Sequence, residues 1–178
     1  LPPVLISLDG AVELTKGSTS RLVRLEDFFI KYGKQDRKAG EFVSALLMPK
    51  GTKPNLRCYK ISKRFDQDIS AVMLAANLEI VDGIMEGVRL AFGGMAGTPK
   101  RASHAEAVLA GNPLDIEHFK KAATALIEDF TPISDMRGSA RYRLLTAQNL
   151  LVKYGLELIS GKQMRLAGQG LAASLDGW

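Results

Sequence analysis

The pattern of hydrophobic and polar positions changes along the 178 residues, from strand-like in the first half to helix-like in the second. Up to about residue 92, apolar residues come in short runs or alternate with polar ones, a pattern typical of strands. From about residue 103, apolar residues recur at spacings of three and four, as they do in amphipathic helices. Strands followed by helices predict an α+β fold.

The first half contains several short segments that we expect to be extended. They are residues 4–8, 11–15, 21–25, 42–48 and 56–62. Residues 26–32 are predicted to form one helical turn that buries Phe28 and Phe29, and a polar loop follows over residues 33–40. Residues 50–55, which contain a glycine and a proline, are the best candidate for a boundary between two lobes.

A hairpin is the strongest local prediction. Residues 71–81 place alternate apolar side chains on one face: Val72, Leu74, Ala76, Leu78 and Ile80. Asp82 and Gly83 follow, and both residue types tolerate the positive φ that a two-residue hairpin turn requires. Residues 84–92 then return as the partner strand. Together with residues 56–62 they predict a three-stranded antiparallel sheet.

Three helices are predicted after this sheet. Ser103 and Glu106 form a candidate capping box for the first, and Asp115 caps the second. The second helix has an apolar stripe of Ile116, Phe119, Ala123, Leu126, Ile127 and Phe130. The third begins at Ser134 or Asp135 and ends at Gly161. Packed on the sheet, the three helices would bury a sufficient core.

Composition narrows the class of protein. Hydrophobic residues make up 46% and charged residues 24%, which argues against intrinsic disorder. We expect no membrane span, because no apolar run approaches ~20 residues, and no signal peptide is visible. The single cysteine, Cys58, cannot form an internal disulfide or an iron–sulfur cluster, and two histidines are too few for most metal sites. A cytoplasmic protein without its own metal is predicted.

The charge pattern favours some partners over others. The net charge of +5 is spread along the chain, and its densest stretch, residues 31–38, has four cations but only one aromatic residue, Tyr32. Single-stranded nucleic acids need several stacking aromatics, so a solvated loop is favoured over a nucleic-acid site. An anionic cofactor or an acidic partner subunit would also suit a basic surface.

The inventory of catalytic motifs is small. Residues 93–97, Gly-Gly-Met-Ala-Gly, could cradle a phosphate, but a tight turn that needs positive φ is the favoured interpretation. The polar cluster over residues 60–68 is interpreted as a charged surface loop, with the alternative that Lys60 points inward and holds a negative group. Cys58 is interpreted as a small core residue on the opposite strand face from Lys60. Near residue 135, one acid and three arginines are interpreted as a weak surface ion-pair cluster: Asp135, Arg137, Arg141 and Arg143.

Several spaced motifs take the prediction further. They are Tyr-Gly-Lys-Gln-Asp-Arg at 32–37, Tyr-Lys-Ile-Ser-Lys-Arg-Phe-Asp-Gln-Asp-Ile at 59–69, Leu-Ala-Phe-Gly-Gly-Met-Ala at 90–96, Thr-Pro-Lys-Arg-Ala at 98–102 and Ser-Asp-Met-Arg-Gly-Ser-Ala-Arg-Tyr-Arg at 134–143. In this order they resemble the flavoprotein part of the molybdenum hydroxylases, in particular the FAD-containing small subunits of bacterial xanthine dehydrogenases. The resemblance covers nearly the whole chain.

The resemblance implies an organisation and an activity. Residues 1–50 would be the last strands of the FAD-binding lobe, residues 51–161 a CO dehydrogenase flavoprotein C-terminal-like domain of sheet and helical bundle, and residues 162–178 an extended or partner-bound tail. In such enzymes a purine is oxidised at a molybdopterin centre in another subunit, and electrons pass through iron–sulfur clusters to FAD, which reduces NAD. The partners implied are the rest of the FAD and iron–sulfur part and a molybdopterin-binding subunit, in a hetero-oligomer.

Two residues carry over from the family to flavin contacts, and none carries over as catalytic. Lys60 matches a lysine that reaches the isoalloxazine, where a positive group favours the reduced, anionic flavin. Val43 matches an apolar residue whose main chain lies against the flavin. Gln67 stands where the family often has an acid. The glycine-rich segment that grips the FAD pyrophosphate lies upstream of Leu1 in the family, so the chain is expected to be incomplete and inactive alone. A non-catalytic subunit-packing domain and a basic nucleic-acid-binding module remain as alternatives.

Overall fold

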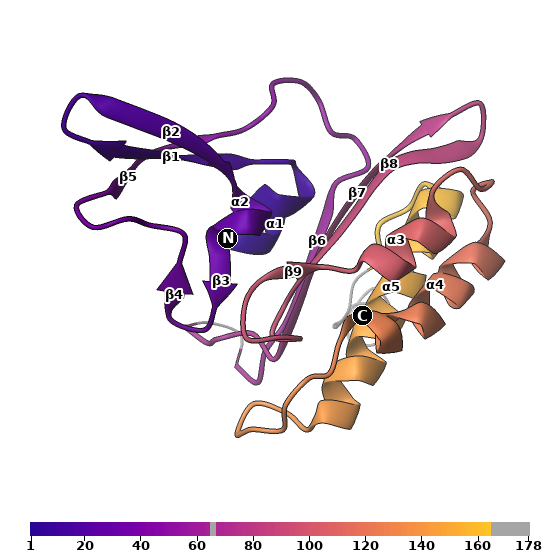
Figure 1. Ribbon diagram of the computed structural model, residues 1–178. Helices are drawn as coiled ribbons and strands as arrows, with labels where there is room; N and C mark the ends of the chain where they lie inside the picture. Colours follow the sequence, from indigo (N-terminus) through magenta and orange to yellow (C-terminus); the bar gives the residue numbers. More distant parts are fainter. Residues whose placement is uncertain (65–66, 165–178) are drawn as a thin grey trace, which may run out of the picture.

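The computed structural model describes residues 1–64 and 67–164. An antiparallel sheet with the order β6-β7-β8-β9 lies between a layer of three helices and a smaller N-terminal lobe (Figure 1). The N-terminal lobe has its own sheet, with the order β2-β1-β5, and a small hairpin of β3 and β4. The α+β class predicted from the sequence is confirmed.

The helices and strands of the described residues have the following bounds. The strands are β1 (Ala11–Lys16), β2 (Thr19–Arg24), β3 (Phe29–Lys31), β4 (Lys34–Gln35), β5 (Phe42–Leu47), β6 (Arg57–Ile61), β7 (Val72–Val81), β8 (Ile84–Gly93) and β9 (Lys100–Arg101). The helices are α1 (Pro2–Ser7), α2 (Leu25–Phe28), α3 (Ser103–Leu109), α4 (Ile116–Asp129) and α5 (Ala140–Ser160).

The chain begins with a helix where the sequence predicted an extended run. Residues 4–8 belong largely to α1, which has a proline at its start, a position where the fixed φ of proline suits a helix. Its apolar side chains Leu5 and Ile6 are buried in the N-terminal core. In a segment of six residues, an apolar run fits a buried helix as well as a strand, so the pattern alone could not decide.

The segments after β2 follow the prediction, except that α2 is shorter and a short strand, β4, is added. The helical turn α2 is shorter than predicted; Phe28 is buried, while Phe29 begins β3 and packs edge-on against it with ring centroids 5.3 Å apart. The expected polar loop over residues 33–40 contains β4, which pairs with β3 as a hairpin. Strands this short and this polar leave no alternating pattern to detect.

The β7–β8 hairpin forms as predicted. Asp82 and Gly83 both have positive φ, at 50° and 79°. The sheet differs from the three strands expected, because a fourth strand, β9, pairs with β8 opposite Ala91 and Phe92. Two residues are too few to produce a strand pattern in the sequence. Of the predicted stripe on β7 only Ile80, near the end of the strand, is exposed.

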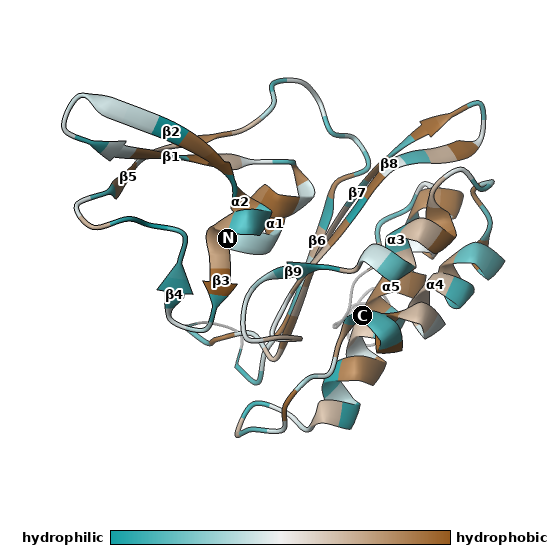
Figure 2. Cartoon of the chain, viewed as in Figure 1, coloured by the Kyte–Doolittle hydropathy of each residue, from teal (hydrophilic) through white to brown (hydrophobic). Residues whose placement is uncertain are grey.

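The helix ends show where local signals succeed. The Asp115 side chain accepts a hydrogen bond from the Glu117 amide and caps α4, and Gly161 ends α5 with a left-handed φ of 66°, both as predicted. Helix α5 starts later than expected, with Ser139 as its N-cap. Figure 2 shows hydrophobic and hydrophilic stretches alternating along α4 and α5, as amphipathic helices require. On α4, however, Ile127 is 63% exposed rather than part of the buried stripe.

The predicted capping box of α3 is wrong. The carboxylate of Glu106 accepts hydrogen bonds from the Leu90 amide and from Arg101 instead of capping its own helix. The amides of His104 and Ala105 donate to the carboxylate of Asp129, at 2.9 and 3.1 Å, so the last residue of α4 caps the start of α3. A cap supplied from 25 residues away leaves no local sequence signal.

An ion network joins the two lobes. Arg89 on β8 donates to the Ile6 carbonyl of α1 at 2.9 Å and to Glu26 of α2 at 2.9 Å. Arg101 on β9 also contacts Glu26, at 3.2 Å, and forms an ion pair with Glu106 of α3 at 2.6 Å. Because these contacts link α1 and α2 to β8, β9 and α3, they hold the N-terminal lobe against the sheet.

Two further findings concern the described residues only. Over residues 1–64 and 67–164, no helix has both the length and the apolar character that a membrane crossing needs. In the same part of the chain, no three His, Cys, Asp or Glu side chains gather as a metal site requires. The predicted cytoplasmic location stays a prediction.

Candidate functional site

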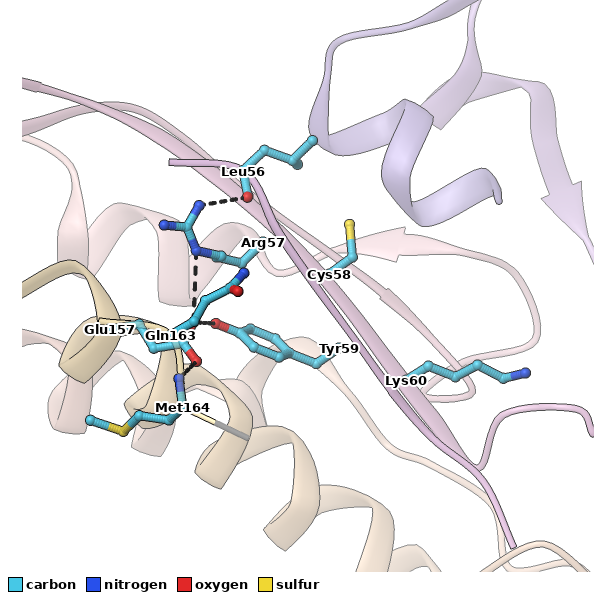
Figure 3. Close-up of a pocket in the computed structure, with 8 residues that line it drawn as sticks. All are labelled: Leu56, Arg57, Cys58, Tyr59, Lys60, Glu157, Gln163 and Met164. Carbon is cyan, nitrogen blue, oxygen red and sulfur yellow. Dashed lines mark hydrogen bonds and ion pairs between the residues drawn. The ribbon is translucent and has the colours of Figure 1, made fainter. Parts of the chain in front are cut away.

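Lys60 lies on β6, the outer strand of the central sheet, and side chains alternate along this strand. Tyr59 is buried and points toward α5, whereas Cys58 and Lys60 point away from α5 (Figure 3). Both are exposed. The interpretation of Cys58 as a core residue on the opposite face is therefore wrong, because residues two apart in a strand share a face. Lys60 is also exposed rather than inward-pointing within this chain.

The face that carries Lys60 is the one that meets the N-terminal lobe. Lys60 pairs with Met73 on β7, and Met73 pairs with Gly93 on β8, so the three residues form one row across the sheet. Directly paired residues project to the same face. A Cβ on Gly93 would come within 3.3 Å of the Pro3 side chain on α1. We call the side of the sheet defined by this row the inter-lobe face.

A neutral pocket lies on the inter-lobe face and is lined by Met73, the cross-strand partner of Lys60, but not by Lys60 itself. It has a volume of about 290 Å³ and is lined by Pro3, Ile69, Ser70, Met73, Gly93, Gly94, Ala96, Gly97, Thr98 and Pro99. No charged side chain is among these residues. Ligand pockets usually have volumes of about 300–1,000 Å³, so this one would hold a ring system but not a whole dinucleotide. We call it the inter-lobe pocket.

The glycine-rich turn in this pocket is held by a buried arginine. Gly94 has a φ of 79°, and a Cβ there would lie 2.2 Å from the Ala71 carbonyl oxygen, so the turn requires glycine. Arg143, only 3% exposed, donates to the carbonyls of Ala71 and Gly94 and to the Asp135 carboxylate. The tight-turn interpretation of residues 93–97 fits these contacts. The arginine cluster, in contrast, is not the weak surface feature expected, because Arg143 is buried in it.

The polar cluster after β6 forms an ordered loop in its described part; Phe65 and Asp66 lie outside the described residues. The Asp68 carboxylate accepts a hydrogen bond from the Arg64 amide at 3.0 Å, which lowers the pKa of Asp68. Lys63 donates to the Met136 carbonyl at 2.6 Å, so the loop is tied to the segment before α5. Gln67 is exposed and adopts a left-handed φ of 51°.

Behind Lys60, a buried carboxylate fixes β6 to α5. Glu157 accepts hydrogen bonds from the Tyr59 hydroxyl at 2.6 Å and from the Met164 amide at 2.8 Å (Figure 3). It accepts a third from Lys153. Burial opposes its ionisation, but these hydrogen bonds prevail and lower the pKa of Glu157. The Arg57 Nε lies 3.7 Å from the same carboxylate. This cluster, which sequence reasoning missed, holds Tyr59 in place. It thereby fixes the position of β6, the strand that carries Lys60.

Val43 lies on a different sheet from Lys60. It is 41% exposed on β5, an edge strand that pairs only with β1 within the described residues. Its neighbours Phe42, Leu46 and Leu47 are exposed as well. Val43 does not line the inter-lobe pocket, nor the pocket of about 450 Å³ at the β6 edge that Lys60 and Tyr59 line. Within this chain, the two predicted flavin contacts are therefore not brought together in either cavity.

Comparison with known proteins places these features in a family. Residues 57–158 match the family described as CO dehydrogenase flavoprotein C-terminal domain, and residues 1–51 match the family described as FAD binding domain in molybdopterin dehydrogenase.

Individual relatives agree with these matches. The nicotine 6-hydroxylase medium subunit of Paenarthrobacter nicotinovorans is 31% identical over 84% of this chain and 52% of its own length. The xanthine dehydrogenase FAD-binding subunit of Escherichia coli O157:H7 is 29% identical over 89% of this chain and 54% of its own length. The solved reconstituted CO dehydrogenase from Oligotropha carboxidovorans has a TM-score of 0.78 and 26% identity over 85% of this chain and 53% of that one.

The chain thus spans about half the length of the curated relatives it matches. One of the two family matches covers more than half of the chain, from the start of β6 to the last turn of α5, and includes the strand that carries Lys60 and the glycine-rich turn. The chain belongs to the CO dehydrogenase flavoprotein C-terminal domain family, the flavoproteins of the molybdenum hydroxylases.

Proposed function

We propose that this chain is the flavin-facing part of the FAD-binding subunit of an NAD-reducing molybdenum hydroxylase. Electrons would arrive from a molybdopterin centre through iron–sulfur clusters and leave through FAD to NAD. A purine such as xanthine is the proposed substrate, on the similarity to the E. coli subunit. The similar identity to a nicotine hydroxylase subunit makes another N-heterocycle the alternative, since the substrate pocket would belong to the molybdenum subunit.

The inter-lobe pocket and Lys60 are the observations that carry the proposal. The pocket is neutral and of ring size, and the absence of a side chain at Gly93 lets the backbone approach Pro3, whose side chain would lie 3.3 Å from a Cβ there. Lys60 stands at the end of the same cross-strand row and has no ion-pair partner among the described residues. A flat, weakly charged ring such as the isoalloxazine fits these residues, with Lys60 at its edge. Lys60, Met73 and Gly93 would hold it from this side.

FAD, when bound, supplies a centre that exchanges electrons in pairs or singly. The chain's own residues would determine the charge and the amount of water around the ring. The ammonium group of Lys60 would stabilise negative charge that develops at the nearby ring, because opposite charges attract more strongly in a site with little water. The uncharged pocket lining would keep water away, and Gln67 adds no carboxylate to the neighbouring loop. None of these groups needs to form or break a bond.

The exposed β5 strand supports the idea that another part of the subunit packs against this half. Its apolar side chains, Val43 among them, lie on an open sheet edge, which is a ready surface for another strand or lobe. We propose that the rest of the FAD-binding lobe covers it and brings Val43 to the flavin. We also propose that residues 1–50, as part of that FAD-binding lobe, and residues 51–161 are separate domains. Most of the predicted tail from residue 162 lies outside the described residues.

The proposal is tested by Lys60→Ala in the complete enzyme. We expect flavin-dependent reduction of NAD to fall at least tenfold, while substrate oxidation with an artificial acceptor at the molybdenum site is unchanged. Lys121→Ala, an exposed lysine on α4, is the matched control and should leave both rates unchanged. Steady-state rates with the two acceptors provide the measurement. An equal loss of both activities would show that Lys60 maintains the fold rather than the flavin.

A subunit-packing domain without a flavin contact is the second candidate, favoured by the exposed β5 surface. Titration of FAD into the chain together with the rest of the subunit separates the two. A bound-flavin absorbance spectrum that changes in Lys60→Ala, in the position or the intensity of its bands, supports the flavin-facing function, and a spectrum identical to that of the wild type supports packing alone.

A further inference from the structure

The two walls of the inter-lobe pocket diverge where the pairing of β7 with β8 ends. The last paired residues at this end of the ladder are Met73 and Gly93, and both line the pocket. Beyond them, one wall comes from residues 69–70, before β7, and the other from the turn that starts at Gly94, after β8. The ladder between β7 and β8 therefore does not fix the distance between the walls.

Arg143 joins the two walls just beyond the last paired residues. Its Nη1 donates to the carbonyl oxygen of Ala71 and to that of Gly94, the second at 2.8 Å. Two carbonyl groups cannot hydrogen-bond to each other, so they need a shared donor to lie close together in a buried place. Gly94 permits this approach, because a Cβ there would lie 2.2 Å from the Ala71 oxygen. Arg143 itself does not line the pocket.

Ala71 also connects this contact to the strand that carries Lys60. Its amide donates to the carbonyl of Ile61, the last residue of β6, at 2.8 Å. This hydrogen bond closes the base of the loop that follows Lys60. A shift of Ala71 would therefore move one wall of the pocket and the end of β6 together.

The guanidinium group of Arg143 is held in place from behind. The Asp135 carboxylate accepts a hydrogen bond from its Nη2, and its Nε donates to the Gly138 carbonyl at 3.4 Å. The arginine side chain is only 3% exposed. Because Asp135 offsets the positive charge, Arg143 acts on the pocket through the positions of the two carbonyl groups more than through its charge.

We propose that Arg143 is a positioning residue for the ring bound in the inter-lobe pocket. It holds the carbonyl groups of Ala71 and Gly94 together and so sets the width of the pocket, without touching the ring. This inference rests on the proposed function, in which the ring is the isoalloxazine of FAD. A pocket of about 290 Å³ leaves little spare room around such a ring, so walls that separate would hold it less firmly.

Arg143→Met in the complete FAD-binding subunit tests the proposal. We expect FAD to bind about tenfold more weakly, and the visible circular dichroism of the bound flavin to change, because both depend on how the ring is held. Arg143→Lys should restore most of the affinity, since one ammonium group can donate to both carbonyls. In the subunit without FAD, the Ala71 amide should exchange its hydrogen faster in Arg143→Met than in the wild type.

Gly155→Ala, on the same helix, is the control for a general loss of stability. A Cβ there would lie 2.4 Å from the Phe119 ring, so the variant is overpacked at a place away from the two carbonyl groups. We expect it to leave the FAD affinity and the flavin dichroism unchanged. If Arg143→Met does not fold, Asp135→Asn takes its place. It keeps the donor of both carbonyls but removes the charge that anchors it, and should weaken FAD binding about threefold.

The possible failures are distinguishable. FAD affinity and flavin dichroism equal to those of the wild type in Arg143→Met would overturn this inference and leave the proposed function standing. Equal weakening by Arg143→Met and Gly155→Ala, or no recovery in Arg143→Lys, would also overturn it, because Arg143 would then act only through overall stability. A wild-type subunit that binds no FAD would overturn both this inference and the proposed function.

Discussion

Arg143→Met is expected to lower the free energy of unfolding of the chain by about 3–5 kcal/mol, the cost of breaking a buried ion pair by removing one partner. The arginine is almost fully buried and serves the carbonyls of Ala71 and Gly94 as well as Asp135. Methionine fills a similar volume but leaves these acceptors without their donor. Urea denaturation followed by circular dichroism measures the difference.

Arg141→Met is the control for this prediction. Arg141 lies two residues away at the start of the same helix but is exposed, so we expect a change within about 0.5 kcal/mol. Equal effects of the two substitutions would mean that the buried contacts of Arg143 contribute little. The glycine-rich turn at the inter-lobe pocket would then not depend on this arginine.

Glu157→Gln is expected to cost a similar amount at pH 7, about 3 kcal/mol or more, because Lys153 would lose its buried negative partner. The effect should depend on pH. Because the folded state lowers the pKa of Glu157, its stabilising contribution is present above the ordinary carboxyl pKa and is lost as the pH falls through the lower folded value. The difference between wild type and variant should therefore shrink between pH 6 and pH 3, as measured by urea denaturation at each pH.

Glu117→Gln provides the comparison. Glu117 also pairs with a lysine, Lys120, but its side chain is 61% exposed, so we expect a change of at most about 1 kcal/mol. A cost for Glu157→Gln that stays constant from pH 6 to pH 3 would assign the effect to packing rather than to charge.

Local signals predicted those parts of the fold that depend on local physics. The turn at Asp82 and Gly83, the cap at Asp115 and the end of α5 at Gly161 each depend on the conformational or hydrogen-bonding preference of one or two residues. The cap of α3 by Asp129 and the strand β9 depend on partners distant in the sequence. No pattern within a short window could reveal them.

In the candidate site, too, only the features that depend on local sequence could be predicted. Strand periodicity predicted the strand that carries Lys60. It could not predict which face of the sheet meets the N-terminal lobe, because that face is decided by the packing of α1. The burial of Arg143 and Glu157 was missed for the same reason, since charged residues in a sequence resemble surface positions until their partners are known. The flavin hypothesis came from the spaced sequence motifs and not from the periodicity of apolar residues.

The central claim is that the ammonium group of Lys60 lies beside the flavin, and the flavin midpoint potential in the complete subunit tests it most directly. Lys60→Met removes the charge and keeps the length of the side chain. We predict that the potential becomes more negative by about 40 mV or more, which for a two-electron couple corresponds to about 1.8 kcal/mol. Lys121→Met should leave it unchanged. A potential in Lys60→Met equal to that of wild type, with FAD fully bound, would contradict the placement of Lys60 at the flavin.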